Sequence, residues 1–281
     1  MSANALDLNN LRLAVLIDAE NVPRKCIKSV MEEIAIYGTP TIKRIYGDWT
    51  SPTIAGWKNP LLENAITPIQ QYGYTIGKNS SDSAMIIDAM DILYSDKTDG
   101  FVIVSSDSDF TRLAIRLREA GQRVIGIGER KTPSAFIAAC DKFTYIEVIR
   151  ANAAEAQADS EETRTDSEET RPDIEENDQK LQTQHRDKHH SPPRVRGIKV
   201  PEAIVQLIAD SIADLADDNG SVFMGELGNL ILKKQPDFDN RNYGYMSLSA
   251  MIKSIDRFEM DFRQTTDPNI KHVFVRDKEA N

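Results

Sequence analysis

Four aspartates in the first half of the chain combine the residue type and the spacing of a catalytic site. Asp18 ends the first long apolar run, Asp107 and Asp109 follow another, and Asp82 opens a segment of helical periodicity. If the apolar runs are parallel strands, their carboxyl ends share one edge of the sheet, which is where such sheets bind ligands. We therefore expect the four carboxylates to converge, provided that the first and fourth strands are neighbours.

The ligand chemistry of these side chains favours a hard divalent cation. Crowded carboxylates repel one another and take up protons unless a cation neutralises them. Oxygen ligands without cysteine or histidine point to Mg²⁺ or Mn²⁺ rather than to zinc. Such ions activate water for attack on phosphorus, so the pattern predicts phosphodiester hydrolysis. We expect neither a histidine base nor a Ser-His-Asp triad in this half, because all four histidines lie at position 185 or later.

Each aspartate also has a purely structural interpretation. An Asp at the start of a helix is commonly an N-cap, which alone would account for Asp82 and Asp109. A functional site is nevertheless favoured, because acids follow three separate strands. At about 100° per residue, Asp82 lies on the apolar stripe of its helix, whereas Asp88 lies on the flank and Asp91 points away.

Further residues near the acids are candidates for substrate contacts. Asn21 and Ser106 have side chains able to orient water or bind phosphate oxygens, although serines in turns more often cap the local backbone. Lys78 and Arg112 are candidates for contacts to a nucleic-acid backbone, and the alternative for each is an ordinary surface ion pair.

Apolar runs alternate with helical patterns along this half of the chain. The expected strands are 11–17, 41–46, 74–78, 101–104, 123–127 and 143–146. One expected helix follows Pro23, and the others occupy 59–72, 82–94, 109–120 and 133–140. Such alternation predicts an α/β fold, with a mostly parallel sheet covered by helices on both faces.

The second half of the chain has a different pattern. Apolar residues at helical spacing predict helices near 204–215, 224–233 and 246–255. Alternating residues at 258–262 and 273–275, on either side of a turn, predict a terminal hairpin. Three helices and a hairpin are the outline of a small winged-helix domain.

These patterns divide the chain into three parts. We expect a first domain at residues 10–150, an acidic disordered linker at 151–195 and the winged-helix domain at 196–278. The linker contains a tandem repeat and has too few apolar residues to offset the entropy of ordering it. We therefore expect the two domains to fold independently and to touch little.

Composition narrows the class of protein further. The formal net charge is −10, but much of the acidity lies in the expected linker, so it argues only against strong, indiscriminate duplex binding. The only cysteines, Cys26 and Cys140, lack the spacing of a zinc finger. No apolar run approaches the roughly 18 residues of a membrane span, and residues 1–10 lack the pattern of a secretion signal. We expect a cytoplasmic protein without a membrane partner.

The segments that carry the aspartates resemble the NYN domain, a member of the PIN-like nuclease group. The similar segments are 16–21, 78–82, 105–110, 126–129 and 139–143, and the last two are similar to the bacterial branch of the family. The resemblance covers about residues 11–149. It implies a PIN-like fold and metal-dependent cleavage of RNA, favoured here as single-stranded, with the four aspartates in the acidic positions. It also aligns Asn21 with the family's Asn after the first acid, and Asp88 with a further Asp of the third helix.

One segment departs from the family pattern. Members often carry a Lys-Gly-Val-Asp type sequence, whereas Asn79, Ser80 and Ser81 precede Asp82 in this chain. The acids themselves are retained, so the departure concerns the approach of the substrate more than metal binding.

The second half resembles the LOTUS, or OST-HTH, winged-helix family over about residues 198–276. The similar segments are 220–230, 236–239, 243–245 and 258–262. The resemblance implies RNA binding or docking to a protein partner. Tyr243 and Tyr245 are candidates for stacking on RNA bases, and an equally weighted alternative makes them core residues.

Two other functions compete with a ribonuclease. A non-catalytic RNA-binding adaptor would keep the fold, and the retained acids argue against it. A phosphatase of the haloacid dehalogenase type also has an Asp at the end of the first strand. That chemistry requires a second Asp two residues later, where this chain has Glu20.

Overall fold

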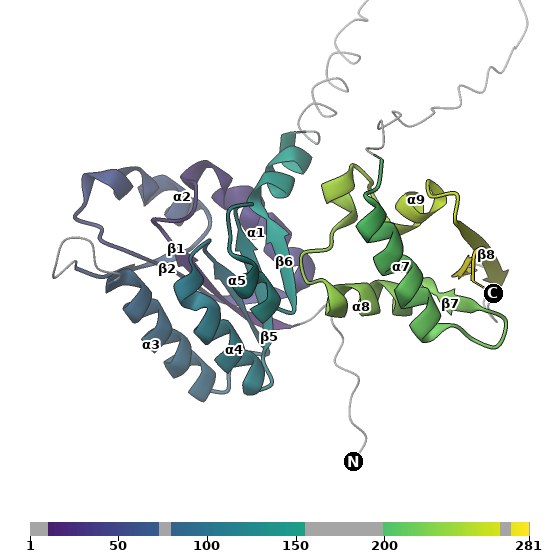
Figure 1. Ribbon diagram of the computed structural model, residues 1–281. Coiled ribbons are helices and arrows are strands. Elements are labelled where there is room, and N and C mark those ends of the chain that lie inside the picture. Colours follow the sequence, from purple (N-terminus) through teal and green to yellow (C-terminus); the bar gives the residue numbers. More distant parts are fainter. Residues whose placement is uncertain (1–10, 73–79, 155–198, 265–270, 281) are drawn as a thin grey trace, which may run out of the picture.

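The computed structural model describes residues 11–72, 80–154, 199–264 and 271–280. These residues form two folded parts, before and after residue 155 (Figure 1). Most of the expected linker lies outside the described residues. Its first residues do not, because the helix that follows the last strand of the sheet continues through residue 154. The expected linker start at 151 therefore falls within this helix.

The first part is built on a six-stranded sheet in the order β3-β2-β1-β4-β5-β6. Every neighbouring pair is parallel, and β1 and β4 lie side by side at the centre. The strands are β1 (Arg12–Asp18), β2 (Thr39–Gly47), β3 (Thr67–Gln70), β4 (Gly100–Val104), β5 (Arg123–Gly128) and β6 (Lys142–Tyr145). The predicted α/β fold with a mostly parallel sheet is confirmed.

Helices cover both faces of this sheet, as expected. One face packs against α1 (Ile27–Tyr37), α2 (Lys58–Glu63) and the helix at 146–154. The other packs against α3 (Ser80–Tyr94), α4 (Thr111–Glu119) and α5 (Ser134–Ala139) (Figure 1). Short 3-10 helices are η1 (Arg24–Cys26), η2 (Pro52–Trp57) and η3 (Ser108–Phe110).

The alternation of side chains in β1 determines which face of the sheet its last residue, Asp18, points to. Leu13, Val15 and Ile17 belong to the core under α1 and α2, whereas Ala14 and Leu16 belong to the core under α3 and α4. Successive strand residues point to opposite faces, so Asp18 continues the series that faces α3 and α4.

The predicted helix 59–72 is wrong in its second half. Helix α2 ends at Glu63, and Ala65 adopts a left-handed backbone with φ 50°. The chain then enters β3, where Thr67 and Ile69 are β-branched residues that suit an extended backbone. The predicted strand 74–78 lies outside the described residues.

The second part has the predicted helices and hairpin. It contains α7 (Glu202–Leu215), β7 (Ser221–Phe223), α8 (Met224–Lys234), η4 (Asn240–Tyr243), α9 (Leu248–Lys253), β8 (Phe258–Gln264) and β9 (Lys271–Asp277). The three strands form an antiparallel sheet in the order β7-β9-β8. One core joins the helices to this sheet through residues such as Ile208, Leu227 and Val275. No helix among the described residues is long and apolar enough to cross a membrane.

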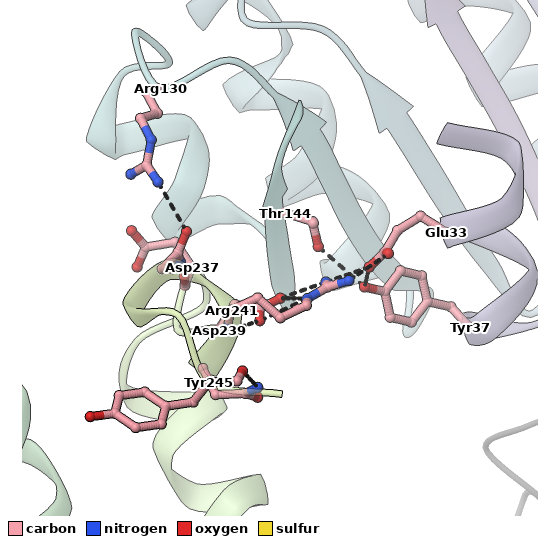
Figure 2. Close-up of polar contacts among 10 residues, drawn as sticks. Glu33, Tyr37, Arg130, Thr144, Asp237, Asp239, Arg241 and Tyr245 are labelled. Carbon is pink, nitrogen blue, oxygen red and sulfur yellow. Dashed lines mark hydrogen bonds and ion pairs between the residues drawn. The ribbon is translucent and has the colours of Figure 1, made fainter. Parts of the chain in front are cut away.

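The expectation that the two parts touch little is wrong. The backbone N–H of Phe143 in β6 donates to the carbonyl of Pro236 at 2.8 Å. Figure 2 shows Arg241, from η4, reaching the carboxylate of Glu33 on α1, with nitrogen–oxygen distances of 2.7 and 2.8 Å. The hydroxyl of Tyr145 donates to Asp237 at 2.7 Å. The second part therefore docks on the edge strand of the sheet, whose outer N–H groups would otherwise lack partners.

Candidate metal centre

Three of the four predicted aspartates form one group at the carboxyl edge of the sheet. Asp82 lies in the first turn of α3, and Asp107 and Asp109 lie at the start of η3, just after β4. One carboxylate oxygen from each lies within 4.8 Å of those from the other two. Asp82 is buried, Asp107 is half-buried and Asp109 is exposed, so the group opens to solvent on one side.

Asp18 lies beside this group rather than in it. Its side chain is only 2% exposed. Its Oδ1 accepts a hydrogen bond from the backbone N–H of Glu20 at 3.0 Å. Its Oδ2 accepts hydrogen bonds from Asn21 Nδ2 at 2.6 Å and from Ser105 Oγ at 3.0 Å. Three donors thus fix the orientation of the Asp18 carboxylate.

Ser105 connects the two central strand ends. Its hydroxyl donates to Asp18 and accepts a hydrogen bond from the backbone N–H of Asp107 at 3.1 Å, and its side chain is fully buried. Sequence reasoning missed this role, because Ser105 looked like the other turn serines. The signal was the register, since Ile17 pairs with Val104 and the next residues are Asp18 and Ser105.

The loop after β4 combines a cap with a candidate ligand. Asp107 is the N-cap of η3, and its Oδ1 accepts a hydrogen bond from the backbone N–H of Asp109 at 2.9 Å. The structural interpretation that was expected for Asp109 therefore applies to Asp107. One cap does not use all of a carboxylate's acceptor capacity, so Asp107 can cap η3 and also bind a cation.

The electrostatics of the group favour a bound cation. Burial, followed by the negative charges of Asp18, Asp107, Asp109 and Glu20, raises the pKa of Asp82 to about 6. An acid with a raised pKa is one whose negative charge is poorly compensated. The donors are all oxygen atoms, which suits Mg²⁺ or Mn²⁺ better than zinc. The residues present therefore fit a hard divalent cation.

Three other candidates from the first half have structural partners. Asn21 holds Asp18, as described above. Ser106 Oγ accepts a hydrogen bond from the backbone N–H of Glu129 at 2.8 Å, which ties the loop after β4 to the loop after β5. Asp88 pairs with Arg44 and accepts a hydrogen bond from the Tyr46 hydroxyl. The helix flank that carries Asp88 thus contacts β2, and Asp88 does not belong to the group of three acids.

The predicted nucleic-acid contacts lie in different places. Arg112 is exposed on α4, close in sequence to Asp109, and Lys78 lies outside the described residues. Tyr243 packs against the core of the second part, and its ring lies 6.3 Å from that of Phe238. The hydroxyl of Tyr245 accepts a hydrogen bond from Ser254 Oγ at 2.8 Å. Both tyrosines are half-buried.

Comparison with protein-family models gives two matches. Residues 12–147 match the NYN domain, and residues 198–270 match the OST-HTH/LOTUS domain. No curated protein matches the chain.

Several solved bacterial structures are similar to parts of the chain. A crystal structure of a protein of unknown function from Vibrio parahaemolyticus is 19% identical, with a TM-score of 0.43, and the match covers 52% of this chain and 96% of that one. An NMR structure of an uncharacterised protein from Nitrosomonas europaea is 28% identical, with a TM-score of 0.27 and coverage of 37% and 94%. An NMR structure of a Chromobacterium violaceum protein is 24% identical, with a TM-score of 0.24 and coverage of 30% and 90%.

Proposed function

This chain carries an NYN domain followed by an OST-HTH/LOTUS domain, and from that premise we propose that it is a metal-dependent endoribonuclease. The NYN domain has a PIN-like nuclease fold, and the OST-HTH/LOTUS domain is an RNA-binding module. The single observation that carries the proposal is the group of Asp82, Asp107 and Asp109, whose carboxylate oxygens lie within 4.8 Å of one another.

The residues at the carboxyl edge of the sheet have separate tasks in this proposal. Asp82, Asp107 and Asp109 would hold Mg²⁺ or Mn²⁺, with Asp18 as the fourth acid beside them. When bound, the cation supplies an activated water and stabilises the charge on the leaving oxygen. Ser105 and Asn21 hold Asp18 in place. Asp109 and Asp107 face the solvent side, where a phosphodiester can approach.

The second domain supplies substrate selection in this proposal. Its likeness to an RNA-binding family supports RNA as the partner, and we favour single-stranded RNA. A protein partner on this domain is the alternative. We place the reaction in the cytoplasm, on the support that Cys26 and Cys140 are both free thiols.

Cleavage of labelled oligonucleotides tests the proposal. Single-stranded RNA and DNA of the same sequence are incubated with the full-length protein in Mg²⁺, in Mn²⁺ and in EDTA. We expect internal cleavage of RNA with either metal and none in EDTA. Cleavage that persists in EDTA contradicts the metal mechanism, and RNA that is bound but never cut supports the adaptor instead.

A further inference from the structure

A cavity of about 470 Å³ opens on the opposite face of the sheet from the three acids. This volume lies within the range of small-molecule sites. Its walls come from η1, from η2 and from the helix at 146–154 that carries Arg150. Its buried wall residues Cys26, Ile54 and Trp57 belong to the core under α1 and α2. The cavity is therefore separate from the group of Asp82, Asp107 and Asp109.

Cations outnumber acids around this cavity. Its charged wall residues are Arg24, Lys25 and Arg150, against one carboxylate, Glu20. All three cations are exposed. Within the described parts of the chain, no salt bridge engages any of them. Three cations that face one hollow without a carboxylate partner favour an anionic ligand.

The guanidinium of Arg24 occupies space that a glycine in η2 leaves open. One guanidinium nitrogen, Nη1, lies 1.2 Å from the point that a Cβ would occupy at Gly56. The guanidinium therefore lies directly over the backbone of η2, in space that any larger residue would fill. The charge of Arg24 therefore lies beside η2, at the wall of the cavity.

One short segment of the chain connects the wall of the cavity to the acidic edge of the sheet. Ala19 and Glu20 line the cavity, and both follow Asp18 directly in the chain. A polyanion lying across the ends of the strands can therefore contact the acids at one point and the cations at the next.

We propose that Arg24, Lys25 and Arg150 form a subsite for the phosphodiester backbone of the RNA strand, adjacent to the phosphate that is cleaved. The proposal rests on the proposed function for the identity of the polyanion. The subsite anchors the strand beside the acids, which otherwise repel its phosphates. It adds affinity without reading the base sequence, because phosphate contacts carry no sequence information.

Binding of single-stranded RNA without metal tests the subsite independently of cleavage. Fluorescence anisotropy in EDTA measures the dissociation constant for the full-length protein and for Arg24→Ala/Arg150→Ala over a range of salt concentrations. Each phosphate contact to single-stranded nucleic acid adds about 0.7 to the salt slope. We expect the slope to fall by about 1.4 and the affinity at 0.1 M salt to fall about 25-fold.

A matched control separates this subsite from general charge. Lys28→Ala/Lys97→Ala also removes two exposed cations, neither of which lines the cavity. We expect this control to bind RNA as the wild type does. Equal losses in the two double variants, or an unchanged salt slope in Arg24→Ala/Arg150→Ala, would overturn the proposal.

Gly56→Val gives a second test that removes no charge. Its side chain occupies the space of the Arg24 guanidinium and displaces it, so we expect the affinity for RNA to fall by up to about 5-fold, the share of one contact. In an Arg24→Ala background the same substitution should have no further effect. If the full-length protein binds RNA but shows no metal-dependent cleavage, the proposed function alone is contradicted. If it cleaves RNA and Arg24→Ala/Arg150→Ala binds RNA as the wild type does, the subsite alone is contradicted.

Discussion

Asp82 is the residue whose surroundings most directly indicate a cation site. It is 7% exposed, and its pKa of about 6 reflects burial and then four neighbouring carboxylates. The fold thus holds the Asp82 carboxylate in surroundings that disfavour its negative charge. Such an arrangement destabilises the metal-free fold, and a cation that binds only the folded chain reverses the cost.

Asp82→Asn is expected to stabilise the metal-free protein at neutral pH. Because the folded-state pKa is raised, ionisation of Asp82 opposes folding above its unfolded pKa of about 3.9, and the cost is complete above pH 6. We therefore expect a higher melting temperature for Asp82→Asn at pH 7.5 in EDTA. The difference should disappear below about pH 4, where both states are protonated.

Asp91→Asn is the matched control for this measurement. Asp91 lies on the same helix, α3, and is exposed. We expect no change in its melting temperature at either pH. A lower melting temperature for Asp82→Asn at pH 7.5 would show that the Asp82 charge is compensated without a cation.

At the scale of elements, the site depends on the pairing of β1 with β4. Ser105 carries this dependence, since its hydroxyl contacts both Asp18 and the backbone of Asp107. Its side chain bonds to the Asp107 backbone and to the carboxylate of the neighbouring Asp18, not to a carboxylate of the group of three, so we regard Ser105 as a positioning residue.

Ser105→Ala is expected to weaken metal binding while the protein stays folded. Loss of the hydroxyl leaves the N–H of Asp107 without this partner and costs about 1–3 kcal/mol of stability. Groups that orient metal ligands typically contribute 10- to 100-fold in affinity, so the metal concentration for half-maximal cleavage should rise by about that factor. Ser108→Ala, in the same loop but exposed, should leave it unchanged. If Ser105→Ala lowers stability but leaves the metal requirement as it was, the serine has only a structural role.

Sequence patterns predicted the elements that are buried on both sides and failed where local signals conflict. The runs that became β1, β4 and β5 are unbroken apolar segments, so their assignment as central strands was secure. The region of α2 and β3 was misassigned, because Pro60 and Leu61 fit a helix and the left-handed turn at Ala65 has no glycine to mark it.

The clustering of the aspartates was predictable to the same extent. The positions of Asp82, Asp107 and Asp109 follow from strand ends alone, whereas the partners of Asp88 and the bridge made by Ser105 depend on strand order and register. Those are set by packing of the whole sheet rather than by any local pattern.

At the scale of the whole molecule, a polar interface joins the two domains. Arg241 contacts Glu33 across the interface and Asp239 within its own turn, and Tyr37 also donates to Glu33 (Figure 2). Glu33 is buried within α1, where a charge without a partner would be costly. The charge of Glu33 has its ion-pair partner only when the second domain is docked. No sequence pattern in α1 predicts this contact.

Replacement of Arg241 is expected to loosen the docking. Removing one partner of a buried ion pair typically costs about 3–5 kcal/mol, and Arg241→Ala removes the salt-bridge partner of both Glu33 and Asp239. We expect a lower unfolding midpoint in urea and a larger radius of gyration in small-angle scattering. Arg276→Ala, which removes an exposed pair with Glu259, is the control. An unchanged radius of gyration for Arg241→Ala would contradict a docking role.

We expect the stability that Glu33 contributes at this interface to depend on pH. Burial raises the pKa of Glu33, but hydrogen bonds from Arg241 and Tyr37 outweigh burial and leave the pKa lowered. A lowered folded-state pKa contributes stability above the unfolded value of about 4.3, which is lost as the pH falls through the folded value. The stability difference between wild type and Glu33→Gln should therefore be largest near pH 7 and shrink below pH 4. A difference that grows on acidification would reverse the assigned sign.

The central claim is that Asp82, Asp107 and Asp109 hold the cation that cleaves RNA. The most direct measurement compares the cleavage rate of single-stranded RNA in Mg²⁺ by the wild type, Asp82→Asn, Asp107→Asn and the control Asp91→Asn. Loss of a charge that stabilises the transition state typically costs 100-fold or more, so we expect both site variants to lose at least about 100-fold and Asp91→Asn to match the wild type. Site variants that cleave as fast as the wild type would contradict the claim, as would an equal loss in Asp91→Asn.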